Sequence, residues 1–301
     1  MKINKSIILF LFGVAFCIDY NNNIYTLSSS SRNLALGNIR IDDDNISSIF
    51  DAPLTVTDNS KNIYFSYNKE FDGLSELIHF GYCFKSSSNY NLGLGIAQRN
   101  IKNNYNTDNA WIDNGDNIPD FNEIDYSKII NFTDQEIGLI ISYNNFIGNN
   151  SLIGFNIKPN YHSIGTSNAL GLSFDITYLK KITFNKIIIG LNDFISVKKW
   201  NYGLKEKFVH RFFINYSCLV NNLLFSIEYD NYSNIKFGFE YQVNEQFALQ
   251  IGSNDSNLSF GIGCKTNYLN ISYAYIHNND VDGIDLDQSH KLGFLFKIKK
   301  I

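Results

Sequence analysis

The side chains that most often carry enzyme chemistry form no recognisable constellation in this sequence. There is no His-Glu-x-x-His pair for a metal, no Gly-x-Ser-x-Gly turn for a nucleophile and no glycine loop for a phosphate. A lipase-like serine and histidine pair is the alternative, but lone histidines are far more often ordinary polar residues. The histidines are scattered: His79, His162, His210, His277 and His290. The sequence therefore predicts no enzyme, and no bound cofactor or metal.

One acidic loop has the ligand types that calcium prefers. Asp113-Asn-Gly-Asp116 is followed by Asp120 and Glu123, so carboxylates lie close together around a glycine. The spacing lacks the full calcium-loop arrangement of alternating acidic ligands and a final glutamate. The prediction is a hydrated loop, with a bound cation as the alternative.

The same loop, residues 100–132, also carries large apolar side chains. They are Tyr105, Trp111, Ile118 and Phe121. Exposed loops with aromatic residues are typical of binding surfaces, so we predict that these residues contact a partner. The alternative is that they pack on one another and cover the rim of the fold.

The segments that position these loops alternate apolar or aromatic residues with small or polar ones. Ile235-Lys-Phe-Gly-Phe-Glu-Tyr-Gln-Val243 is a clear example. Alternation with period two predicts β-strands with one apolar and one polar face. Strands are predicted over residues 62–70, 74–84, 90–99, 133–144, 150–160, 168–179, 186–197, 207–219, 222–230, 234–243, 246–253, 257–265, 268–277 and 288–299.

These strands predict an all-β fold, a transmembrane antiparallel β-barrel of about 14 strands. Aromatic residues make up 15% of the chain, which suits a lipid-facing surface. In strand 234–243 the apolar residues would face lipid and Lys236 would face inward, because lysine at the lipid midplane costs about 2–4 kcal/mol. The alternative is an exported β-sandwich.

The net charge of the chain, −4, gives no reason to expect binding to nucleic acid.

The N-terminus has the features of a secretory signal. Lys2 and Lys5 precede an apolar run from Ile7 to Phe16, and Ala15-Phe16-Cys17 is a cleavage site candidate. Lipidation of Cys17 is the less favoured alternative, because bulky Phe16 precedes it. We predict a signal peptide over 1–17, a plug or periplasmic segment over 18–60 and the barrel over 61–301.

An even strand count places both ends of the barrel on one side, which is the periplasm in bacterial barrels. Starting there, the short connections fall on the periplasmic side. The two longest connections, 100–132 and 278–287, fall on the outside. This is the asymmetry expected of an outer-membrane barrel in a bacterial cell.

The N-terminal segment contains a motif that resembles a known family. Its residues are Arg32, Ala35, Leu36 and Gly37, then Asp42, Asp43, Asp44, Ser47, Phe50, Ala52 and Pro53. They resemble the N-terminal signature of the PorV/PorQ family, within the wider group of FadL-like outer-membrane barrels. The family ends this motif with Asn-Pro-Ala, whereas this chain has Asp51-Ala-Pro53, and proline restricts its own backbone and its predecessor's.

The resemblance implies a fourteen-stranded barrel with the N-terminal segment inside or beneath it. PorV/PorQ proteins take part in type IX secretion, which implies secreted cargo proteins as partners at the external loops. Relatives in the FadL-like group admit hydrophobic small molecules through the barrel wall, which implies a small-molecule partner instead. Outer-membrane lipid is expected around the barrel in both cases.

Overall fold

The computed structural model describes residues 18–20, 24–25, 30–42, 45–54, 61–86, 90–107, 109–115, 120–148, 150–232, 234–254, 257–278 and 288–298. The predicted signal peptide, Cys17, Asp43, Asp44, Ile118 and most of the loop 278–287 lie outside these residues. Among the described residues no helix is long and apolar enough to cross a bilayer.

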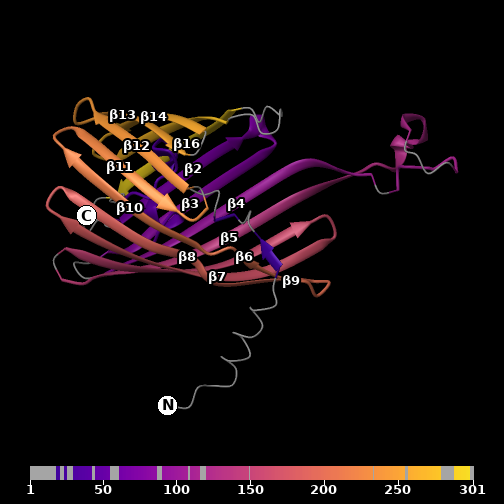
Figure 1. Ribbon diagram of the computed structural model, residues 1–301, viewed down its shortest axis with the longest axis horizontal. Coiled ribbons are helices and arrows are strands. Elements are labelled where there is room, and N and C mark those ends of the chain that lie inside the picture. Colours follow the sequence, from indigo (N-terminus) through magenta and orange to yellow (C-terminus); the bar gives the residue numbers. More distant parts are fainter. Residues whose placement is uncertain are drawn as a thin grey trace, which may run out of the picture.

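Fourteen strands in the described part of the chain form a closed antiparallel barrel (Figure 1). β2 pairs with β16, so that Lys61 lies opposite Ile298, and β7 pairs with β8 to complete the ring. Closure excludes the β-sandwich alternative. The strands are β2 Lys61–Glu70, β3 Ser75–Ser86, β4 Tyr90–Asn106, β5 Ile130–Phe146, β6 Ser151–Ile164, β7 Ser167–Ile182, β8 Asn185–Trp200, β10 Arg211–Val220, β11 Leu223–Asp230, β12 Asn234–Gln242, β13 Phe247–Asn254, β14 Asn257–Lys265, β15 Leu269–His277 and β16 Gln288–Ile298.

The two faces of the strands have the predicted character. On β12, Ile235 and Phe237 are 49% and 43% exposed, whereas Lys236 between them is 1% exposed and points into the lumen. On β16, Leu292 and Phe296 are exposed and Lys291 is buried in the same way. An apolar outer surface with charged residues inside is the arrangement required of a barrel in lipid.

The connections at the two ends of the barrel differ in length. At the turn end, β5–β6, β7–β8, β10–β11, β12–β13 and β14–β15 are joined by two to four residues. At the other end, the loop end, β4 and β5 extend far beyond their neighbours, and the described residues that connect them, 107, 109–115 and 120–129, lie at the tip (Figure 1). Residues 101–132 are called the outer hairpin below.

β4 and β5 are longer than predicted, reaching Asn106 and Ile130 instead of residues 99 and 133. The register shifts between Ile101 and Asn104, after which pairing resumes. The outer part of this hairpin is rich in polar residues, because it lies beyond the apolar belt and needs no alternation. The pattern on which the prediction depended therefore ends before the strands do.

The predicted strand 207–219 is interrupted in the structure. It consists of a short strand, β9 Lys205–Phe208, and of β10, which begins at Arg211. The interruption lies beside a bulge in β8, where Asp193 has a left-handed backbone with φ +55° and its N–H donates to the Asp175 carboxylate at 2.9 Å. Because the bulge ends the regular β8–β10 ladder, Phe208 turns inward and its ring packs on Tyr25.

The short strand β1 Ile18–Tyr20 pairs with β9 in parallel. The chain also contains the short helix α2 Ser31–Ala35 and the 3-10 turns η1 Ile46–Phe50, η2 Phe71–Gly73, η3 Phe121–Glu123 and η4 Tyr126–Lys128. α2 and η1 lie inside the barrel, where they contact strands from both halves of the sheet. Residues 30–42 and 45–54 are called the plug below.

Candidate functional site: the plugged lumen and the outer hairpin

The plug begins with a capped helical turn. The Ser30 hydroxyl accepts a hydrogen bond from the Asn33 N–H at 3.1 Å, which satisfies a donor that the first turn of α2 leaves unpaired. The helix ends at Ala35, and just beyond its C-cap Leu36 the chain turns at Gly37, whose φ of +82° is a left-handed conformation that glycine adopts without strain. The Arg-x-x-Ala-Leu-Gly motif is therefore one helical turn and its C-terminal end.

Glycines on the barrel wall let the plug backbone approach closely. A Cβ atom at Gly252 on β13 would lie 2.0 Å from the backbone nitrogen of Gly37. A Cβ at Gly154 on β6 would lie 1.8 Å from the carbonyl oxygen of Pro53. Any side chain at these positions would collide with plug backbone, so inward glycines determine where the plug packs.

Arg32 connects α2 to the far wall. Its Nε and Nη2 donate to the two carboxylate oxygens of Glu240 at 2.6 and 2.9 Å, a bidentate pair. The Gln250 amide on β13 donates to the same carboxylate at 3.1 Å. This motif arginine thus joins the plug to β12.

Arg40 forms a second connection, to β11 and β12. Its guanidinium contacts Glu228 at 2.5 Å and Asp230 at 3.1 Å, and its backbone N–H donates to Glu228 at 2.7 Å. Lys236 completes the group, because its ammonium donates to both carboxylates and to the Asn38 carbonyl at 3.1 Å. All of these charges are buried, so each depends on its partners.

Two aspartates of the plug have different roles. Asp42 accepts ion pairs from Lys181 at 3.2 Å and Lys186 at 3.0 Å, both at the turn end. Asp51 instead accepts hydrogen bonds within the plug, from the Ser30 N–H at 3.1 Å and the Asn33 amide at 2.9 Å. Burial raises the pKa of the Asp51 carboxyl to about 6, although these bonds and the nearby Lys291 oppose the shift.

The corner at Asp51-Ala-Pro53, where the motif departs from the family pattern, is a compact turn. The Ala52 N–H donates to the Ser48 carbonyl at 2.8 Å, and the Leu54 N–H donates to the Ala52 carbonyl at 2.7 Å. The Asn192 amide on β8 donates to the Asp51 carbonyl at 3.2 Å. Ala52 and Leu54 pack on Leu152, Leu179, Ile188 and Phe213 of the wall.

The 3-10 turn η1 forms the apolar centre of the lumen. Asn45 caps it by accepting from the Ser47 N–H at 2.8 Å. The Phe50 ring packs against Tyr64 and His79, with ring centroids 6.1 and 4.9 Å apart. Ile46 and Ile49 are fully buried in the same cluster.

Charged side chains of the wall fill the lumen beside the plug. Lys158 contacts Asp175 at 2.7 Å and Asp193 at 2.8 Å, so the bulge residue completes an ion triad. Arg99 pairs with Glu136 at 3.1 Å. These groups leave the plug surrounded by paired charges.

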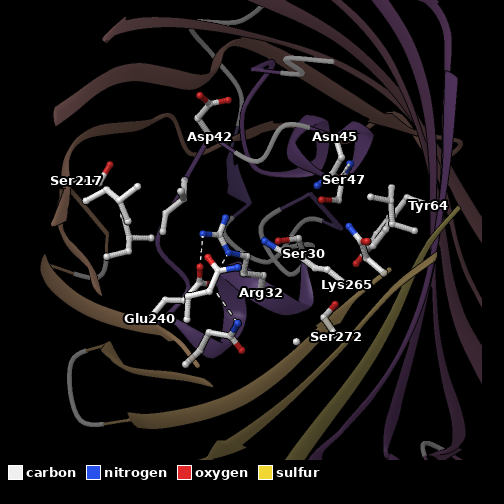
Figure 2. A pocket seen from close by; sticks show the side chains of 18 of the residues that line it. Ser30, Arg32, Asp42, Asn45, Ser47, Tyr64, Ser217, Glu240, Lys265 and Ser272 are labelled. Carbon is white, nitrogen blue, oxygen red and sulfur yellow. Dashed lines mark hydrogen bonds and ion pairs between the residues drawn. The ribbon is translucent and has the colours of Figure 1, made fainter. Parts of the chain in front are cut away.

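A cavity of about 460 Å³ lies between the plug and the turn ends of β10 to β16. Figure 2 shows Arg32 and Glu240 joined on one side of it, with Asp42, Asn45 and Ser47 on another. Its walls are mixed, with Ile41, Leu219, Leu224 and Leu295 among hydroxyl, amide and lysine side chains. The plug forms the inner end of this cavity.

The second large pocket, of about 400 Å³, is on the outer hairpin. It is mostly apolar and is lined by Thr107, Ala110, Trp111, Asp120, Phe121, Ile124, Tyr126 and Ile129. Trp111 and Ile124 form an isolated β-bridge, and the Trp111 ring N–H donates to Glu123 at 2.8 Å. Glu123 also completes a capping box with Asp120, so these acidic residues organise the loop backbone.

The predicted partner-binding residues are only partly brought together. Trp111 and Phe121 line the pocket, whereas Tyr105 lies on β4 and does not. The prediction missed Ile124 and Tyr126, which the same rule of apolar residues in a polar loop would have selected. The described residues of the family signature all belong to the plug, where they contact the barrel wall or other plug residues. They are Arg32, Leu36, Gly37, Phe50, Ala52 and Pro53.

No protein-family model and no curated protein matches this chain. The closed fourteen-stranded fold is that of a bacterial outer-membrane β-barrel, in agreement with the predicted location. The Pseudomonas putida toluene transporter TodX has a TM-score of 0.61 at 8% identity, covering 92% of this chain and 99% of TodX. The CymD monoaromatic hydrocarbon channel has a TM-score of 0.58 at 9% identity, covering 92% and 98%.

At these identities the likeness establishes the fold. It contains nothing specific to PorV/PorQ or to secretion.

Proposed function

We propose that this protein is an outer-membrane channel for small hydrophobic molecules, with the plug controlling its lumen. The observation that carries the proposal is the apolar pocket of the outer hairpin, at the loop end of a barrel whose fold hydrocarbon channels share. Trp111, Phe121 and Ile124 supply aromatic and aliphatic walls, which favour ligands whose burial removes apolar surface from water. A volume of about 400 Å³ accommodates a single aromatic ring.

Passage through the lumen requires the plug to move, because the wall and plug side chains fill the space beside it. The plug is held by apolar contacts and also by ion pairs and hydrogen bonds, and water can replace these polar contacts when they separate. We therefore propose two states of the barrel, one with the plug packed against the glycines of the wall and one with the plug displaced.

The proposal is tested by tying the plug to the wall with a disulfide. The Ser31 hydroxyl lies 2.8 Å from the Ser272 hydroxyl on β15, so cysteines at both positions would be in contact. The variant S31C/S272C is made in a background without Cys83, Cys218 and Cys264. We expect its oxidised form to stop toluene uptake by proteoliposomes, and a reducing agent to restore it.

The matched control is S31C alone, which cannot form the bond and should keep the uptake rate under oxidising conditions. Equal uptake by oxidised and reduced S31C/S272C would show that the plug does not control passage. Uptake no faster than in empty liposomes for every variant would contradict the channel function itself.

A second function, delivery of secreted proteins to the cell surface, is favoured by a different observation. On the outer hairpin Phe121 is 84% exposed and Tyr126 is 68% exposed, an uncommon arrangement unless a partner covers them. Deleting residues 103–128 should then abolish retention of cargo proteins while the barrel still shows its heat-modifiable gel shift. Unchanged retention in the deletion variant would remove this second function.

A further inference from the structure

A row of outward-facing residues crosses four strands near the loop end. Tyr161 on β6 lies opposite Leu170 on β7, Leu170 lies opposite Lys199 on β8, and Lys199 lies opposite Lys205 on β9. The alternate residues His162 and Lys198 are buried in the lumen. Since neighbouring residues of a strand point to opposite faces, the row faces the membrane side of the wall.

The two lysines in this row face one another without a counter-charge. In the described part of the chain neither Lys199 nor Lys205 makes an ion pair. The nearest carboxylate along the chain, Glu206, is directed to the lumen, where it lies 3.8 Å from the Lys198 ammonium. Like charges directly opposite in a sheet are destabilising, so this pair suits an anion bound from outside.

The row lies where the surface changes from apolar to polar. One pair closer to the barrel centre, Leu172 lies opposite Val197. One pair farther out, Asn168 lies opposite Ser163, and its carbonyl accepts the Asn201 N–H at 2.8 Å. Lysines at such a boundary extend their ammonium groups into the headgroup layer of the lipid.

We propose that Lys199 and Lys205 bind the phosphate of a phosphorylated glycolipid in the outer leaflet of the membrane. Leu170, which is 69% exposed, and Tyr161 contact its acyl chains, while Asn168 and Asn201 face its sugar. With an even strand count both ends of the barrel chain lie on the periplasmic side, so the loop end faces the cell exterior. The row of residues therefore lies in the outer leaflet of the membrane. This site is separate from the pocket of the outer hairpin and from the lumen.

The test compares lipid binding by the purified barrel and by K199Q/K205Q, measured by native mass spectrometry in detergent with bisphosphorylated lipid A. Each lysine near an anionic lipid surface strengthens binding about fivefold, so we expect the double variant to bind about 30-fold more weakly. K102Q is the matched control, because Lys102 is at the same end but already pairs with Glu76 at 2.9 Å. It should bind lipid A as the wild type does.

Three results would overturn the proposal, provided the variants keep the heat-modifiable gel shift of a folded barrel. The first is equal lipid A binding by the wild type and K199Q/K205Q. The second is equal binding of dephosphorylated lipid A. The third is lysine-dependent binding of inorganic phosphate alone, which would assign the site to a free anion. Because toluene uptake is not part of the measurement, failure here leaves the proposed channel function unaffected.

Discussion

Neutralising Glu240 should loosen the plug. Glu240→Gln keeps the shape of the side chain but removes the charge that Arg32 contacts at 2.6 and 2.9 Å. A hydrogen bond to a charged group contributes about 1.5–3 kcal/mol. The lower part of that range applies, because the Arg32 side chain is 19% exposed and water partly replaces the lost partner. A loss of about 1.5–2 kcal/mol corresponds to a plug displaced about 10- to 30-fold more often.

The assay is maleimide labelling of a cysteine that the packed plug covers. Ser31 is fully buried against the wall, so S31C in a background without the other cysteines should react only when the plug is displaced. We expect E240Q to raise the labelling rate of S31C by about 10- to 30-fold. The control is E245Q, because Glu245 is an exposed carboxylate in the β12–β13 turn at the same end of the barrel.

The reasoning is refuted if E240Q labels at the wild-type rate, or if E245Q accelerates labelling as much. A double-mutant cycle with R32Q sharpens the test. If Arg32 and Glu240 act as a pair, R32Q/E240Q should label little faster than either single variant. Additive effects would mean that each residue holds the plug through other contacts.

Three further predictions use the same plug reporter or the outer pocket. Gly252→Ala should strongly increase the labelling rate of S31C, since the new Cβ would lie 2.0 Å from the Gly37 nitrogen. Gly263→Ala is the control and should change the labelling rate little, because its new Cβ would lie 3.3 Å from the flexible Gln250 side chain. Burial raises the pKa of Asp51 from 3.8 to about 6, so the packed plug holds a proton that the free plug releases, and raising the pH from about 4 to 6 should loosen the plug. Asp51→Asn should abolish this increase of S31C labelling with pH, measured relative to the labelling of an exposed cysteine. If the pH dependence of labelling is unchanged in Asp51→Asn, a different titrating group causes it. Phe121→Ala should weaken toluene binding about tenfold or more, measured by the fluorescence of Trp111 in a W200F background. Tyr105→Ala should leave toluene binding unchanged, because Tyr105 lies outside the pocket. Equal effects of the two substitutions would argue against the pocket as the toluene site.

Alternation was sufficient to predict the strands and their faces because a barrel in lipid imposes it on every strand. Lys236 between Ile235 and Phe237 has one acceptable orientation, and the structure confirms it. The pattern fails where that constraint ends. On β8, Asn192 and Asp193 break the alternation, and there the structure has the bulge that separates β9 from β10.

The contacts across the lumen could not be predicted in the same way. Period two indicates that Glu228 and Glu240 point inward, but it does not indicate which plug residue each one meets. Arg40 and Glu228 are 188 residues apart in the chain, and their contact depends on the depth of the plug in the barrel. That depth depends on where glycines such as Gly252 let backbone approach backbone, which becomes visible only once the register of all strands is known.

On the proposed function, the polar contacts of the lumen explain how the plug can be held in place and still be released. Buried ion pairs such as Arg40 with Glu228 contribute little net stability, because the cost of removing charges from water offsets their attraction, yet an unpaired partner would be very unfavourable in a dry site. Each pair therefore specifies one position of the plug without binding it irreversibly. If water enters as the plug moves, both partners become hydrated and the cost of release falls. An apolar interface of the same area would lose its stabilisation on contact with that water. On the proposed function, the inward face of the strands thus provides a reversible closure, while the outward face keeps the barrel itself in lipid.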